Sequence, residues 1–498
     1  MARATRAGSS AGFPELNRRG GARGSVPADI MMPRLGLLVA VALLVLIGIV
    51  MVFSASTVEA IHNGESATSY VVKQAIFAVF GSALALFVYT RDYRSLQGGP
   101  CFWVFWGICA ALLLAVPVIG TNILGATRWI YIGGFSVQPT EFAKIMLVVA
   151  AAKVLLEYRD QIRDRKQALI AAFVLVLLPL LFLYKTQSDM GSAVVILVGA
   201  FVVMWLGGLP GRFVAVLGIA VVVGGVFGIA GYRADRVSVW LDPWSDQYDT
   251  GYQMIRSFFA FSEGGILGVG LGNSREKFLY LPEAETDFIF SIIGEELGLV
   301  GALFVIALFV AVLVCGLLIA KRASDDFGTM IAGGLTCMLV GQAFLNMACA
   351  TGLFPTTGKP LPFISSGGSS VVASLLMVGI IMSVSRVAGE EALTPHRASA
   401  ERRRANLSYI RVEDEPPARS RFSSSESAPV VDAPARSRHS HGDPFGGLMA
   451  PRGGASRNAS RGSSRPEGNA SLGSRASRRH DSGMERGANR RGSGRNSR

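Results

Sequence analysis

Long apolar runs constrain this chain more than any other feature of its sequence. A transmembrane helix needs about 20 consecutive, mostly apolar residues. Ten runs approach or exceed this length, at residues 35–54, 72–90, 102–120, 139–156, 168–184, 191–206, 213–231, 288–320, 328–351 and 369–385. We therefore predict an all-α polytopic membrane protein with about ten transmembrane helices. The eighth run is long enough to tilt, to extend beyond the lipid, or to begin with a buried half-helix.

Charge divides the chain into three parts. The net charge is +13, and many of the basic residues lie near the two ends. We predict a basic cytoplasmic segment at 1–34, a transmembrane domain at 35–390 and a disordered, Ser-, Arg- and Gly-rich cytoplasmic tail at 391–498. Because basic cytoplasmic tails are usual in membrane proteins, this charge does not indicate a nucleic-acid partner.

The short loops give the orientation of the bundle. Arginine and lysine residues precede the first run and follow the second, fourth, sixth and eighth, whereas the alternate short loops hold few. The positive-inside rule then places both termini in the cytoplasm. The largest loop, about 232–287, lies outside, and its mixture of aromatic, glycine and charged residues is typical of a functional loop.

Cysteine and histidine show no catalytic spacing. The five cysteines lie in apolar stretches without a CxxC pair, and four of the five histidines lie in the tail. The sequence therefore indicates no disulfide, zinc site or histidine-based dyad in the membrane domain.

Charged residues inside the apolar runs need a reason, because each costs roughly 2.5–3.5 kcal/mol on insertion scales. Glu141 and Lys144 are three residues apart and share a helical face. They form either an interfacial ion pair that offsets its own insertion cost, or the wall of an outward-facing cavity. In the second case, Arg128 in the preceding loop can close the cavity against the membrane surface.

The eighth run begins near Asp287 and meets Glu295 and Glu296 about two turns later. An aspartate just before an apolar run is a common N-cap, so capping and catalysis both remain open for Asp287. Adjacent residues on a helix face different directions. We expect one of the two glutamates to bond a neighbouring helix and the other to reach the cavity.

The loop at 355–370 is rich in proline and glycine. Its prolines stiffen it, and its last glycines can present backbone N–H groups to an anion at a helix N-terminus. In the ninth run, Gln342 and Asn346 are four residues apart and predict a polar stripe that bonds another helix.

Several of these segments resemble a known family. They are similar to the SEDS family (shape, elongation, division, sporulation), whose members include FtsW and RodA, over about residues 35–386. The division member looks more similar than the elongation member. The resemblance rests on residues 51–56, 125–130, 138–144, 187–191, 270–277, 281–290, 294–298 and 355–370.

The resemblance implies a ten-helix fold and a peptidoglycan glycosyltransferase of the bacterial cytoplasmic membrane. Such an enzyme joins lipid II units at the outer face, here at the division septum, by an inverting transfer that releases undecaprenyl pyrophosphate. The implied catalytic residue is Asp287. The implied substrate-binding residues are Arg128, Gln138, Glu141, Lys144, Glu296, Ser365, Ser366, Gly367 and Gly368.

The resemblance also implies partners: a class B penicillin-binding transpeptidase, other division proteins and membrane lipids. It implies no certain cofactor and leaves a divalent cation, Mg²⁺ or Mn²⁺, open. The sequence departs from the family at Glu285, where histidine is common, at Lys359, where an apolar residue is usual, and at Ser366, where tyrosine is frequent.

Two other functions remain open. A lipid II flippase would also use charges inside the membrane, although the sequence shows no inverted repeat. A scaffold that only activates its transpeptidase would need no charged cavity.

The topology is testable by cysteine labelling in intact cells, after the five native cysteines have been replaced. We expect a cysteine at position 247 to react with a membrane-impermeant maleimide. A cysteine at position 162 should react only after the cells are opened, because its loop is basic. Labelling at 162 but not at 247 would contradict the topology.

The tail is testable by truncation. We expect deletion of residues 400–498 to leave glycan polymerisation in vitro intact. The reason is that the tail has too few apolar residues to build a core and lies across the membrane from the predicted site. Lost activity in a truncated chain that still elutes as a monodisperse species would show that the prediction is wrong.

Overall fold

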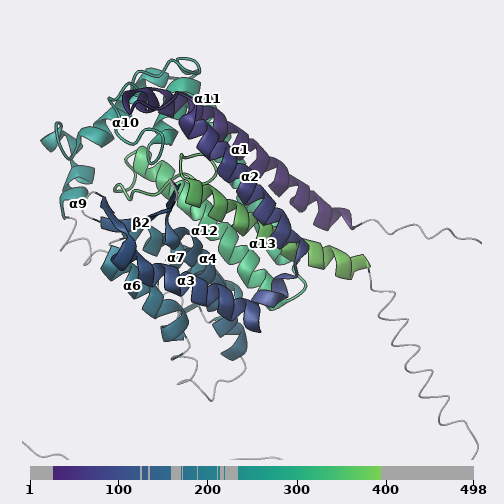
Figure 1. Cartoon of the computed structure of the whole chain (residues 1–498). Coiled ribbons are helices and arrows are strands. Elements are labelled where there is room, and N and C mark those ends of the chain that lie inside the picture. The colour runs from purple at the N-terminus through teal and green to yellow at the C-terminus, as the bar shows by residue number, and fades with distance from the viewer. Residues whose placement is uncertain are drawn as a thin grey trace, which may run out of the picture. The chain divides into compact units, whose positions relative to one another are not determined.

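The computed structural model describes residues 26–123, 126–132, 135–158, 170, 172–187, 189–209, 211–212, 218 and 234–393 (Figure 1). The chain forms two compact units, 1–416 and 417–498, and the second lies outside the described residues. The predicted seventh run also lies outside them, apart from residue 218, as does almost all of the predicted tail.

Helices occupy the other nine predicted runs. They are α1 (Ala28–His62), α2 (Ser69–Thr90), α3 (Pro100–Ile119), α4 (Pro139–Tyr158), α6 (Leu178–Gln187), α7 (Met190–Leu206), α11 (Ile289–Lys321), α12 (Asp326–Ala350) and α13 (Gly368–Leu393). Among the described helices, α1, α2, α3, α11, α12 and α13 are long and apolar enough to span a membrane, and α6 and α7 are shorter apolar helices. The predicted all-α polytopic membrane fold is therefore confirmed.

A small sheet between α3 and α4 was not predicted. Strands β1 (Thr121–Ile123), β2 (Ala126–Ile132) and β3 (Phe135–Val137) pair antiparallel in that order. Strands of three residues are too short for a period-two pattern to stand out, which explains the omission. The sheet places Arg128 on its central strand.

Shorter elements complete the described chain. They are the 3₁₀ turns η1 (Tyr93–Leu96) and η4 (Pro243–Asp246), the π-helical turn η3 (Phe173–Leu177), α9 (Ala234–Leu241) and α10 (Tyr252–Gly264). The last part of the predicted outer loop, after α10, consists of turns that lead into α11.

Helices α12 and α13 form the interior of the bundle. Almost all of α13 is buried, and α12 packs against α4, α7 and α11. Small residues permit the closest approach, as expected between helices in lipid. A Cβ added at Gly199 of α7 would lie 3.4 Å from the Gly334 carbonyl oxygen of α12. Figure 1 shows α1 and α2 running alongside each other on the α13 side of the bundle.

Helix α11 is broken at Gly298, where φ is +67° and ψ is −168°. Before the break the helix is almost wholly buried, whereas Leu299 and Val300 just after it are half exposed. The freed backbone groups find partners, since Leu299 N donates to the Gly265 carbonyl and Val300 N donates to the Ile266 carbonyl. Non-helical backbone at membrane depth is tolerated where protein covers it. The eighth run therefore begins with a buried half-helix, one of the three predicted options.

Ion pairs join the ends of several helices at the side of the bundle that we predicted to be cytoplasmic. Arg94, after α2, pairs with Asp325 at 2.7 Å and with Glu391 at 2.8 Å. Asp325 also caps α12 by accepting a hydrogen bond from Gly328 N. Arg322, after α11, pairs with Asp29 at the start of α1. These helix ends therefore lie at one end of the bundle, as the predicted topology requires.

Candidate active site

Asp287 lies in the turn that leads into α11. The N-cap of α11 is Phe288, so the interpretation of Asp287 as the N-cap residue is wrong. Asp287 instead lines a cavity of about 60 Å³ together with Gln253, Asn346 and the segment 356–359. A Cβ added at Gly358 would lie 3.5 Å from Oδ2 of Asp287, so the carboxylate faces this segment closely.

Asn346 of α12 holds the two sides of this cavity together. Its Nδ2 donates to the carbonyl oxygens of Asp287 and Lys359, both at 2.8 Å. The polar stripe on α12 was predicted to bond another helix, which Gln342 does by accepting a hydrogen bond from Lys144 of α4, whereas Asn346 bonds loop backbone. Oδ1 of Asn346 is buried and has no partner among the described residues, which leaves an acceptor beside the cavity.

The Pro- and Gly-rich loop is bonded to the backbone just before Asp287. Ser365 Oγ donates to the Thr286 carbonyl at 2.5 Å, and Ser366 N donates to the Glu285 carbonyl at 2.8 Å. Gln74 of α2 donates to the Ser365 carbonyl at 3.1 Å. The Ser365 side chain is therefore occupied in positioning the segment around Asp287.

The two predicted glycines lie at the start of α13, and Gly368 is its first residue. A Cβ at Gly368 would lie 2.3 Å from the Phe77 ring, so glycine is required there by packing. Next to it, Ser369 Oγ accepts a hydrogen bond from Gln138 N at 3.0 Å, which ties the start of α4 to α13. An anion site at these N–H groups stays a prediction.

Glu141 and Lys144 form the predicted pair on one face of α4. Lys144 Nζ lies 2.6 Å from Glu141 Oε2, and both side chains are buried. Lys144 also donates to Gln342 Oε1, and Gln342 Nε2 donates to the Pro360 carbonyl at 3.0 Å. This chain of bonds links α4 through α12 to the loop that lines the cavity.

A second buried ion pair was not predicted. Lys359 Nζ lies 2.7 Å from Asp189 Oδ2, and the two side chains are 1% and 0% exposed. Asp189 also caps α7, because Oδ1 accepts a hydrogen bond from Ser192 N at 3.0 Å. The sequence held a signal, since Asp followed three residues later by Ser at a helix start is a cap pattern, and a membrane-buried lysine needs a carboxylate.

Arg128 reaches the same side of the cavity from β2. Its Nε donates to the Gln187 carbonyl at 2.9 Å, two residues before Asp189. The Gln187 side chain is buried, and both of its polar atoms lack a partner among the described residues. The cations Arg128 and Lys359 therefore both lie near Asp189, and Lys359 belongs to the cavity that Asp287 lines.

Glu295 and Glu296 both lie in the buried half of α11 and away from the residues that line the Asp287 cavity. Glu296 accepts a hydrogen bond from Ser54 of α1 at 2.6 Å and pairs with Lys277 at 2.9 Å. Glu295 accepts a hydrogen bond from Ser274 Oγ. The expectation that one of them reaches this cavity is therefore wrong, because the turn at 274–277 closes over both.

Burial raises the pKa of Glu285 to about 7, and the nearby carboxylates of Glu283, Glu59 and Asp287 add to this effect. Glu285 therefore titrates near neutral pH, two residues from Asp287. The ionisation of Glu285 is therefore the main change of charge that we expect next to the cavity near neutral pH.

Among the described residues, no group of three or more His, Cys, Asp or Glu side chains gathers into a metal-binding arrangement. The divalent cation therefore stays a prediction.

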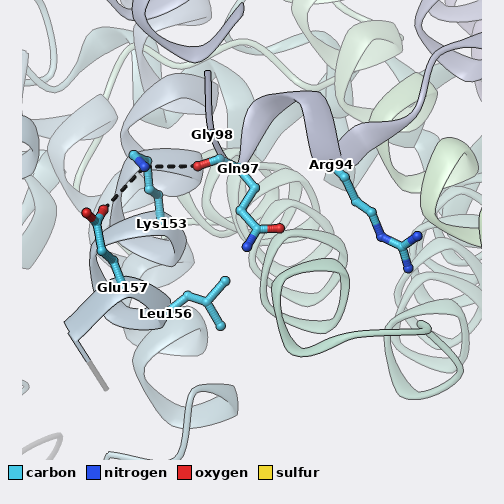
Figure 2. Close-up of a pocket in the computed structure, with 6 residues that line it drawn as sticks. All are labelled: Arg94, Gln97, Gly98, Lys153, Leu156 and Glu157. Atoms are coloured by element: carbon cyan, nitrogen blue, oxygen red, sulfur yellow. Dashed lines mark hydrogen bonds and ion pairs between the residues drawn. The ribbon is translucent and has the colours of Figure 1, made fainter. Parts of the chain in front are cut away.

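A larger polar pocket, of about 520 Å³, lies at the other end of α4. Figure 2 shows Lys153 between the Gln97 carbonyl oxygen, at 3.0 Å, and the Glu157 carboxylate, at 3.3 Å. It shares no residue with the Asp287 cavity and lies at the predicted cytoplasmic end. It is therefore separate from the candidate active site.

Comparisons with known proteins agree with this arrangement. Residues 34–390 match the model of the FtsW/RodA/SpoVE family, described as "Cell cycle protein". The "Probable peptidoglycan glycosyltransferase FtsW" of Geobacter sulfurreducens is 38% identical over 351 residues, which is 70% of this chain and 94% of that protein. The "Stage V sporulation protein E" of Bacillus subtilis is 36% identical over 364 residues, covering 71% and 97%.

Two solved structures have the same fold. One is described as "Structural coordination of polymerization and crosslinking by a peptidoglycan synthase complex", with a TM-score of 0.56, 28% identity and coverage of 71% of this chain and 98% of that chain. The other is the rod shape determining protein RodA of Thermus thermophilus, with a TM-score of 0.51, 28% identity and coverage of 70% and 96%. The predicted resemblance is confirmed, and the chain belongs to the FtsW/RodA/SpoVE family of cell cycle proteins.

Proposed function

We propose that this protein is a peptidoglycan glycosyltransferase that polymerises lipid II at the outer face of the bacterial cytoplasmic membrane during septal wall synthesis. The single observation that carries the proposal is the placement of Asp287. Its carboxylate lines a cavity whose walls are held by hydrogen bonds from Asn346, Ser365 and Ser366. The names of the relatives support the same reaction.

The Asp287 carboxylate fits the role of general base. In the reaction, a sugar hydroxyl of the acceptor attacks the anomeric carbon of the donor while its proton passes to the carboxylate. The leaving lipid pyrophosphate gains negative charge as the bond breaks. Attack opposite the leaving group inverts the anomeric centre, by analogy with inverting glycosidases.

Arg128 and Lys359 supply positive charge on the side of Asp189. Fixed cations in a site from which water is excluded stabilise developing charge without reorganising. Lys359 is neutralised in part by Asp189, so we assign it to holding the loop and Arg128 to the pyrophosphate. A divalent cation at the pyrophosphate remains a proposal that no described cluster of carboxylates supports.

The proposed partner is a class B penicillin-binding transpeptidase. Support comes from the similarity to a structure described as a peptidoglycan synthase complex. The proposal also includes other division proteins as partners and the division septum as the location, in keeping with the family description "Cell cycle protein".

We expect Asp287→Asn to reduce glycan polymerisation by roughly 10²–10⁴-fold, because an amide cannot accept the proton. Asn is nearly isosteric, and the Asn346 bond uses the backbone carbonyl of residue 287, so the fold should survive. The measurement is glycan chain formation from lipid II by purified protein with its transpeptidase.

Asp242→Asn is a matched control in the same outer loop. Asp242 caps η4 by accepting a hydrogen bond from Trp244 N, and it does not line the cavity. Near wild-type chain formation by Asp287→Asn would exclude Asp287 as the base and direct the search to Glu283 or Glu285.

We expect the rate of the wild-type protein to fall as the pH rises through about 7, the pKa of Glu285. Glu285 is neutral below this pH, and above it a second carboxylate stands near Asp287 and repels the anionic pyrophosphate. Glu285→Gln stays neutral throughout and should lose this step in the pH–rate profile.

Glu263→Gln, at an exposed position of α10 outside the cavity, should keep the wild-type profile. If the profiles of Glu285→Gln and wild type coincide, Glu285 does not act on the site.

A further inference from the structure

An apolar groove of about 630 Å³ lies between α1, α2 and α13, on a side of the bundle remote from Asp287. Helix α13 forms its floor, and α1 and α2 form its walls. Lining residues include Leu38, Ala42, Ile49, Ala85, Leu375 and Gly379. The volume is within the usual range for ligand sites, roughly 300–1,000 Å³.

The groove ends at Arg34, near the start of α1. Arg34 is held by Ser385 of α13, with Nε donating to Oγ at 3.1 Å and Nη2 donating to the carbonyl oxygen at 2.6 Å. Among the described residues, no hydrogen bond uses Nη1 of Arg34 and no carboxylate pairs with it. The guanidinium is thus fixed at the mouth of the groove with one nitrogen available.

Two further arginines lie at this end of the bundle, although Arg91 does not line the groove. Arg386 of α13 donates from Nε to the Tyr89 carbonyl at 2.8 Å and from Nη2 to the Arg91 carbonyl at 3.1 Å. Tyr89 itself lines the groove. The Arg91 side chain is exposed and lies over the Phe87 ring, with its guanidinium carbon 4.8 Å from the ring centroid.

Charge at this mouth is not balanced within the described chain. Glu390 pairs with Arg386 at 2.6 Å. No described carboxylate pairs with Arg34, so its positive charge remains at the open end of the apolar groove. An apolar channel that ends in a guanidinium group is complementary to a ligand with a hydrocarbon chain and an anionic head.

We propose that this groove binds an anionic glycerophospholipid of the cytoplasmic leaflet. One acyl chain lies along α13 between α1 and α2, and the phosphate is bound by Arg34. Along α1 the lining extends from Arg34 to Ile49, about 22 Å at 1.5 Å per residue. This exceeds the roughly 15 Å thickness of one hydrocarbon leaflet, so the groove can hold a whole acyl chain.

The competing explanation is that these arginines only anchor the helix ends at the interface, as the positive-inside rule requires. Interfacial anchoring needs no groove and does not distinguish one phospholipid from another that fills the same space. Selectivity for an anionic head and sensitivity to blocking the groove therefore separate the two explanations. Lipid selectivity and the effect of blocking the groove can each be measured without the proposed glycosyltransferase activity.

The test is native mass spectrometry of the purified full-length chain, titrated with dioleoyl phosphatidylglycerol or dioleoyl phosphatidylcholine. We expect the anionic lipid to be retained more strongly. Removing the arginine, in Arg34→Gln, should weaken its retention roughly fivefold, and should weaken that of the zwitterionic lipid, whose phosphate is balanced by its own choline, much less.

Ala42→Trp tests the groove itself, because Ala42 is exposed within it and the indole would fill the channel without entering the core. This variant should lose the retained phosphatidylglycerol although all the charges remain. Lys321→Gln is the matched control, since Lys321 is an exposed cation at the same end of the bundle and outside the groove.

Equal retention of the two lipids by the wild-type chain would overturn the proposal, as would an equal loss in Lys321→Gln and Arg34→Gln. Unchanged phosphatidylglycerol retention by Ala42→Trp would place the lipid elsewhere and overturn it as well.

Discussion

The interior of a bilayer offers no hydrogen bonds, so every charge that this bundle buries needs a partner within the protein. Three buried lysines meet this requirement by pairing with a carboxylate: Lys144 with Glu141, Lys277 with Glu296 and Lys359 with Asp189. Each pair also bonds a neighbouring segment. The pairing therefore decides which loops are attached to which helices, and the loop that lines the Asp287 cavity is attached through Lys144 and Lys359.

Such pairs are weak arguments for stability. The cost of removing two charges from water offsets most of their attraction. Removing one partner, however, leaves the other charge buried and unpaired, which destabilises the fold by about 3–5 kcal/mol. The main effect of these ion pairs is to fix the positions of the segments that they join. Lys359 binds its loop to the start of α7, and Asn346 binds the same loop to the backbone of Asp287. A carboxylate that must accept a proton from a lipid-linked sugar is thereby held in position before the substrates arrive.

The broken helix α11 solves a related problem. The substrates are lipid-linked, whereas the reacting sugars are polar, so the site must lie close to the membrane and yet be shielded from lipid. The buried half of α11 brings Asp287 to this depth, and the break at Gly298 lets the rest of the helix cross the membrane. The glycine-rich turn at 265–270 pairs with the exposed backbone of the break. The glycines of this turn thus serve close backbone packing, since a Cβ added at Gly268 would lie 2.2 Å from the Glu296 carbonyl oxygen.

The sequence by itself determined the membrane class, the positions of nine described helices and which buried charges need a partner, because span length and the cost of buried charge act locally along the chain. The i, i+3 spacing alone predicted the pair of Glu141 and Lys144. Only the tertiary structure decided which partners meet over long separations. Lys359 and Asp189 are 170 positions apart, and nothing local to either residue specifies the other. The same holds for Glu296, which looked like a cavity residue until the fold brought Ser54 and Lys277 against it. Local rules fix which groups need partners, and the packing of distant helices fixes which partners they receive.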